Sequence, residues 1–150
     1  MLFPVEPPFD TRPLVEGDAV ALPNRGTLSH FPLEHPGGTV GYRLEWPGKS
    51  IAYVTDTTAT ADAEYLDHIR GADVLVHECY FPDGFEERAQ LTGHSCLSPV
   101  ARLARDADVG RLILVHVNPL ASRDDVAALE SAREIFAELE VGYDKMVVEF

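Results

Sequence analysis

Alternating apolar and polar positions in the first third of the chain predict antiparallel strands. Residues 39–46 alternate in this way, and an apolar, β-branched run follows at 49–56. Between them, Pro47 and Gly48 suit the centre of a type II turn, so residues 39–56 are expected to form a hairpin. Shorter strands are expected before it, at 18–22 and 27–33.

After residue 56, short apolar runs alternate with helical patterns. Strands are expected at 73–77, 111–117 and 146–150, and helices at 61–70, 98–106 and 122–139. Ser122 and Asp125 have the spacing of a capping box at the start of the last helix. Residues 81–93 are polar and irregular, with one helical turn expected near Glu86. This order predicts an α/β fold in which helices cover one face of a sheet, so the other face needs a partner.

Length and composition fit one soluble domain. The 150 residues are enough for one core, with a proline-rich, extended lead-in at 1–16 and the folded part at 17–150. No long apolar run or signal peptide is present, which argues against a membrane protein. Cys79 and Cys96 do not make a disulfide framework, so a cytoplasmic location is expected.

The formal net charge of −13 bears on possible partners. An acidic surface repels phosphate backbones, so the charge argues against nucleic acid as a partner for this chain alone. A phosphate-containing substrate stays compatible with this charge, because a metal ion in the site reverses the local sign.

Polar residues stand at the ends of three predicted strands. Asp56 ends one, His77 and Glu78 end the next, and His116 ends a third, while His94 lies in a loop between them. Open α/β sheets hold ligands at the carboxyl ends of their strands. Carboxylate and imidazole without thiolate suit zinc, manganese or iron at a hydrolytic centre.

Four segments, within a span from about His35 to Phe150, carry a family resemblance. The segments are Val54-Thr55-Asp56-Thr57, Val74-Leu75-Val76-His77-Glu78-Cys79-Tyr80-Phe81, Gly93-His94-Ser95 and Leu114-Val115-His116. In this order they resemble the C-terminal half of the metallo-β-lactamase superfamily, in the branch of ribonuclease Z and small phosphodiesterases. The resemblance implies half of an αββα sandwich, with a mixed sheet and helices on one face.

The resemblance also implies roles for individual residues. Asp56 would bridge two metal ions, zinc by preference and manganese or iron otherwise, and His116 would bind the second ion. His94 would contact the substrate together with Ser95, steadying the scissile phosphate or protonating the leaving oxygen. His77 and Glu78 would orient the loop that carries His94. The metal ions would lower the pKa of water and hold the phosphoryl oxygens.

The histidine cluster of the family, His-x-His-x-Asp-His, is absent from this sequence. Asp56 and His116 are too few ligands for a catalytic zinc, which takes about three protein ligands. Three explanations follow, ranked from the most to the least expected. The chain is truncated, it is a subunit completed by another chain, or it is a binding protein that retains the fold of an enzyme. The sequence is also compatible with a homo-oligomer. In the first two cases the isolated chain should be inactive.

The substrate expected from the sequence is a small or cyclic phosphodiester. Ribonuclease Z holds transfer RNA with a basic arm before the Asp strand, whereas residues 1–50 contain four basic and six acidic side chains and no Gly/Lys-rich insertion. A ribonuclease Z-like endonuclease that processes transfer RNA 3′ ends is an alternative. A non-catalytic α/β module that binds a protein through the uncovered sheet face is another.

Overall fold

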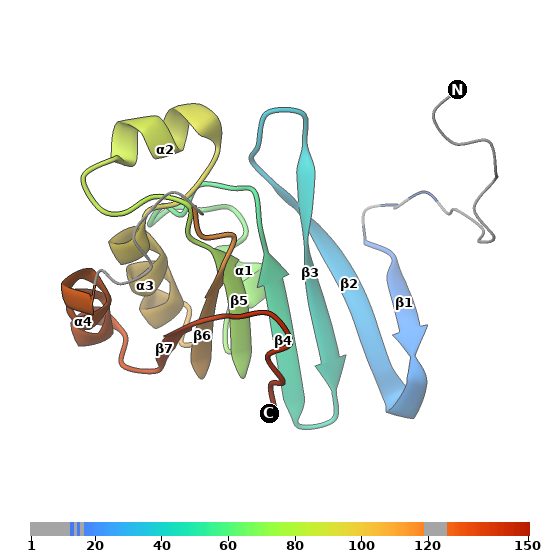
Figure 1. The fold of residues 1–150 in the computed structure, drawn as a ribbon. Coiled ribbons are helices and arrows are strands. Elements are labelled where there is room, and N and C mark those ends of the chain that lie inside the picture. The colour runs from blue at the N-terminus through green and yellow to red at the C-terminus, as the bar shows by residue number, and fades with distance from the viewer. Residues whose placement is uncertain (1–12, 14, 16, 119–125) are drawn as a thin grey trace, which may run out of the picture.

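One sheet of seven strands organises the molecule, with the strands in sequence order. The computed structural model describes residues 13, 15, 17–118 and 126–150. The strands are β1 (Ala19–Leu22), β2 (Gly26–Leu33), β3 (Thr39–Trp46), β4 (Lys49–Val54), β5 (Val74–Glu78), β6 (Arg111–Val115) and β7 (Leu139–Val141). Strands β1 to β4 are antiparallel to their neighbours, and β4 to β7 run parallel (Figure 1). The predicted hairpin at 39–56 is confirmed, with Gly48 at φ +83°.

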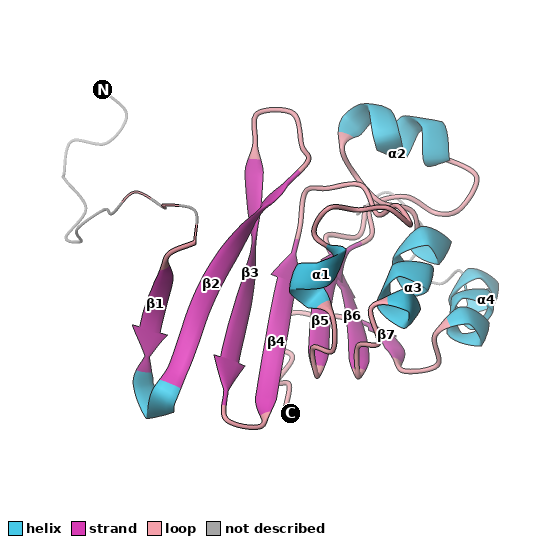
Figure 2. Cartoon of the chain, turned by 180° about the vertical axis from the view of Figure 1, so that it is seen from behind, coloured by secondary structure: helices cyan, strands magenta, loops and turns pink. Residues whose placement is uncertain are grey.

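The helices cover one face of this sheet. They are α1 (Leu66–Ile69), α2 (Glu86–Thr92), α3 (Leu97–Asp106) and α4 (Val126–Ile135), with a short 3-10 turn at Pro23–Arg25. Figure 2 shows α1 and α3 in front of the parallel strands, while α2 lies beyond the strand ends. The α/β class, with a mixed sheet and helices on one face, is thus confirmed. Among the described residues, no helix has the length and apolar character needed to cross a membrane.

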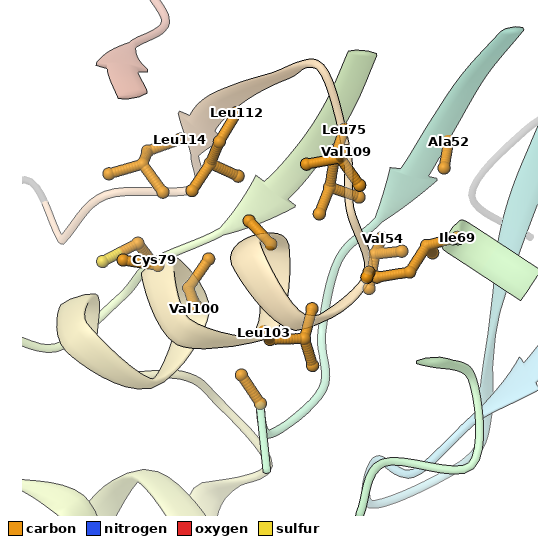
Figure 3. Close-up of a cluster of buried hydrophobic side chains, with 14 of the residues drawn as sticks. Ala52, Val54, Ile69, Leu75, Cys79, Val100, Leu103, Val109, Leu112 and Leu114 are labelled. Carbon is orange, nitrogen blue, oxygen red and sulfur yellow. The ribbon is translucent and has the colours of Figure 1, made fainter. Parts of the chain in front are cut away.

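The core lies between the parallel strands and α3. Leu75, Leu112 and Leu114 point toward the helix and are fully buried against Val100 and Leu103 (Figure 3). Burying each leucine side chain stabilises the fold by about 1.5–3 kcal/mol. The rigid parallel strands therefore give firm support to the residues that follow their ends.

On the opposite face of the sheet, the described residues form no helix. Tyr53 on this face is 43% exposed. The chain after Gly142 crosses in front of β4 to β6 without joining the sheet (Figure 1). A hollow of about 630 Å³ adjoins this segment, and its lining includes Ile113 and Met146 on this side together with Leu97 and Leu129 of the helices. An apolar face of this kind is typical of a surface that binds another polypeptide.

Several predicted elements differ from the structure. The helix expected at 61–70 is a single turn at its end, because successive i to i+3 bonds, from Ala63 N–H to the Thr60 carbonyl and onward, make turns instead. The irregular segment 81–93 contains two turns of helix, α2. The helix expected to reach 139 ends at Ile135, since Leu139 begins β7 beside Leu112.

The strand expected at 146–150 is wrong. Those residues have a strand-like sequence but pair with no strand among the described residues. A strand needs a neighbouring edge for its hydrogen bonds, which sequence alternation alone does not supply. The capping box at 122–125 and most of the lead-in at 1–16 lie outside the described residues.

Candidate metal centre at the strand ends

The parallel strands bring four polar side chains to one edge of the sheet. Asp56 follows β4, Glu78 ends β5, His116 follows β6, and His94 follows α2. One ligand atom of each of these residues lies within 4.8 Å of those of the other three. The register, which pairs Val54 with His77 and His77 with Leu114, aligns these strand ends. The four side chains are therefore close together, as the sequence analysis expected for a shared site.

Asp56 and His116 are the accessible members of this group. The Asp56 carboxylate and the His116 ring are 38% and 41% exposed, and His116 Nδ1 lies 3.2 Å from Asp56 Oδ1. Both residues have positive φ, 55° and 52°. Residues other than glycine rarely adopt this conformation, which costs roughly 1–2 kcal/mol each, although Asp and His adopt it more readily than most. Backbone strain of this kind is concentrated at functional sites.

Glu78 joins the loops that carry Asp56 and His94. Its carboxylate is fully buried and accepts hydrogen bonds from the Thr57 and Ser95 backbone N–H groups, at 2.9 and 3.0 Å. The same carboxylate lies 2.9 Å from His94 Nδ1. Since a carboxylate accepts hydrogen bonds, Nδ1 of His94 carries the proton, and the ring orientation is fixed.

Ser95 strengthens this connection from inside the fold. Its hydroxyl donates to the Thr57 carbonyl at 2.7 Å and accepts from the Ala59 N–H at 2.9 Å, and its side chain is fully buried. This placement differs from the expected contact with a substrate. Within the fold, Ser95 positions the loop that carries His94.

His77 lies away from the four-residue group. Its ring is fully buried, with Nδ1 donating to the Glu78 carbonyl at 2.7 Å and Nε2 accepting from the Tyr65 hydroxyl at 2.9 Å. None of these bonds reaches the loop that carries His94, which His77 was expected to orient. Burial lowers the pKa of His77 from 6.5 to about 4 and raises that of Tyr65, so both are neutral at pH 7.

Stability should depend on pH through His77. Below pH 6.5 the unfolded chain binds a proton on this ring that the folded chain does not bind until about pH 4. The free energy of unfolding should therefore fall by about 3 kcal/mol as the pH drops from 6.5 to 4. Urea unfolding at several pH values measures this slope, and His77→Gln should flatten it. Equal slopes for the two proteins would contradict the assignment.

His35 and the two cysteines lie close to the site without entering the four-residue group. His35 Nδ1 donates to the Gly93 carbonyl at 2.9 Å, and a Cβ on Gly93 would lie 2.6 Å from that nitrogen. A side chain at position 93 would therefore force either the His35 ring and Pro36 or the loop of His94 to move. Cys79 and Cys96 are free and buried, and burial raises the pKa of the Cys96 thiol to about 11, so it stays protonated.

Aromatic rings lie beside the site, which the sequence analysis did not predict. Tyr80 stacks on His94, with ring centroids 5.0 Å apart, and meets His116 edge-on at 5.6 Å. Phe81 and Phe85 continue this surface away from the strand ends. The Phe81 to Phe85 spacing was visible in the sequence, but only the fold shows that the rings adjoin His94.

Comparisons with known proteins agree with this architecture. A family model described as a beta-lactamase superfamily domain matches residues 2–117. Ribonuclease Z of Haloferax volcanii is 39% identical over 90 residues, which are 60% of this chain and 28% of the relative. Ribonuclease BN of Enterobacter sp. (strain 638) is 41% identical over 106 residues, 68% of this chain and 33% of the relative. The chain thus spans about a third of the length of these curated relatives.

A solved structure shows a similar fold. The metallo-beta-lactamase fold protein YhfI from Bacillus subtilis superposes with a TM-score of 0.79 at 20% sequence identity. The match covers 91% of this chain and 54% of YhfI. At this identity the similarity concerns the fold alone, and it places the chain within about half of a larger architecture.

Proposed function

Because the chain belongs to the metallo-β-lactamase superfamily, in its ribonuclease Z-like branch, we propose that it forms one half of a metal-dependent phosphodiester hydrolase. The observation that supports this most directly is the convergence of Asp56, Glu78, His94 and His116 at the carboxyl ends of parallel strands. Convergent carboxylates and imidazoles at such an edge are typical of a metal-assisted hydrolytic site.

The donor atoms fit a divalent metal of the zinc, manganese or iron group. Asp56 and His116 offer an accessible carboxylate oxygen and an imidazole nitrogen, and we assign them as ligands. Glu78 is fully buried and already accepts three hydrogen bonds, so we assign it to positioning. When bound, metal ions supply an activated water molecule and positive charge for the phosphoryl oxygens.

His94 is the residue we assign to proton transfer. Glu78 holds its Nδ1–H, which leaves Nε2 as the atom available to a substrate. A proton carried on Nε2 would pass to the leaving oxygen of the phosphodiester as the bond to phosphorus breaks. Tyr80, stacked on the ring, keeps it from rotating out of this orientation.

The remaining metal ligands would come from polypeptide outside this chain. Two accessible ligands fall short of the three that a catalytic zinc takes, and the sequence contains no His-x-His-x-Asp-His cluster. A second copy of the chain would bring the same residues and no such cluster. The apolar sheet face with its hollow of about 630 Å³ supports the presence of a covering segment.

Metal content tests this proposal. We expect the chain alone to bind less than one zinc ion and to leave bis(p-nitrophenyl) phosphate intact. Joined to a segment that carries the histidine cluster, it should bind two ions and hydrolyse this diester. Inductively coupled plasma mass spectrometry and release of p-nitrophenol measure both quantities. Stoichiometric zinc together with turnover by the chain alone would contradict the half-site proposal.

Processing of transfer RNA is the second candidate, favoured by the names of the curated relatives. Ribonucleases Z and BN are about 40% identical to this chain over the matched regions. The expectation of a small phosphodiester rather than nucleic acid, based on charge, therefore stays a prediction. Cleavage of precursor transfer RNA by the completed protein, compared with cleavage of a cyclic nucleotide, decides between them.

A further inference from the structure

A second pocket opens beside His94. Its volume is about 570 Å³, and its lining includes Tyr80, Phe81, Phe85, Arg88 and His94. Arg88 and Thr92 of its lining belong to α2, the helix beyond the strand ends in Figure 1. Since His94 belongs to both the pocket and the metal centre, a substrate bound at the metal centre would extend into this pocket.

Flat aromatic surfaces form much of this pocket. Phe81 and Phe85 lie nearly parallel, at 13°, with ring centroids 6.2 Å apart. Phe81 is buried, whereas Phe85 is 47% exposed. The exposed Phe85 ring beside this cavity offers a flat apolar surface to a ligand. Every nucleobase has a flat π face that stacks on such a ring.

Arg88 adds positive charge to the same pocket. Its guanidinium carbon lies 5.9 Å from the Phe81 ring centroid, and among the described residues no carboxylate lies within ion-pair distance of its side chain. On a chain with a net charge of −13, an arginine that forms no ion pair within the described part of the chain and lies beside aromatic rings favours an anionic, aromatic ligand. A purely apolar ligand would make no use of this charge.

We propose that this pocket binds the nucleobase adjacent to the scissile phosphate, with the base stacked on Phe85 and Arg88 bound to a phosphate oxygen. The position of the scissile phosphate rests on the function proposed above. The pocket accordingly selects phosphodiesters that carry a base on this side over those that carry only a sugar or an alkyl group.

Binding to the chain without metal tests this directly. Adenosine 5′-monophosphate and ribose 5-phosphate are titrated in buffer with a chelator, followed by NMR chemical shifts. We expect the nucleotide to bind about tenfold more tightly, since stacking on an aromatic ring contributes about 1–3 kcal/mol per base. Phe85→Ala should remove this difference, and Phe85→Tyr should retain it. Arg88→Gln should weaken both ligands about tenfold.

Leu91→Ala is the matched control, because Leu91 is on the same helix and is 82% exposed. It should leave both affinities unchanged. The dinucleoside monophosphate ApA identifies the source of the base: tighter binding than the mononucleotide indicates an RNA chain, and equal binding indicates a single nucleotide. Equal affinities for nucleotide and sugar phosphate, or a Phe85→Ala variant that still discriminates, would overturn the proposal.

The two proposals fail separately. If the completed protein hydrolyses no phosphodiester while Phe85→Ala abolishes base discrimination, the hydrolase assignment falls and the base-binding pocket stands. If hydrolysis occurs without any preference for a base, the pocket assignment falls and the hydrolase stands. Circular dichroism of each variant verifies that the fold is retained.

Discussion

Asp56→Asn in the completed protein is expected to lower kcat/KM for a phosphodiester by about 100-fold or more and to reduce the metal content. Asparagine keeps the size of the side chain but removes the negative charge that attracts the ions. Changes to groups that merely orient metal ligands cost about 10–100-fold, so loss of a ligand should cost at least the upper value. Hydrolysis rates and metal content of the purified variant measure both effects.

Asp62→Asn serves as the control, because Asp62 is exposed and lies outside the four-residue group. It should retain both ions and the parent activity. Turnover close to that of the parent in Asp56→Asn, with two ions bound, would remove Asp56 from the ligand set.

Glu78→Ala should destabilise the fold by about 3–5 kcal/mol. The change leaves two buried backbone N–H groups and the His94 Nδ1–H without an acceptor, and it releases both loops from β5. Urea unfolding of the chain at pH 7 gives the difference in free energy. Glu87→Ala on the exposed side of α2 should change stability very little.

Glu78→Gln separates positioning from stability. The glutamine side chain keeps one oxygen that accepts hydrogen bonds. Its NH2 group, however, would face N–H donors for which a carboxylate oxygen had been the acceptor. In the completed protein we expect hydrolysis to fall about 10–100-fold with the metal still bound. Loss of the metal instead would indicate that Glu78 is itself a ligand.

The sequence was most informative where local chemistry determines the structure. Pro47 and Gly48 identify the turn of the hairpin, and the apolar runs at 73–77 and 111–117 identify the central strands. Since parallel strands end at one edge, this was enough to expect Asp56, His77 with Glu78, and His116 at a common edge, of which His77 lies outside the four-residue group. These predictions depend on the spacing of apolar residues and on the order of the strands, and both can be read from the sequence.

The sequence was less informative where tertiary contacts determine the structure. Residues 61–65 have a helical composition but form turns, and Tyr65 at their end reaches the buried His77. Residues 146–150 have strand propensity, but propensity describes a half-buried surface and identifies no partner. Ser95 and the base-binding pocket needed the fold, because burial and the stacking of Phe85 depend on residues distant in sequence.

The positive φ angles of Asp56 and His116 have a consequence for how this chain would respond to selection for stability alone. Glycine is the residue that adopts such torsions without steric cost, yet these two positions carry the side chains that we assign as metal ligands. A search for more stable variants should therefore enrich glycine at both positions, and the enriched sequences would have lost the groups that face the sheet edge. At these two positions, glycine would relieve the backbone strain but would have no side chain to bind a ligand.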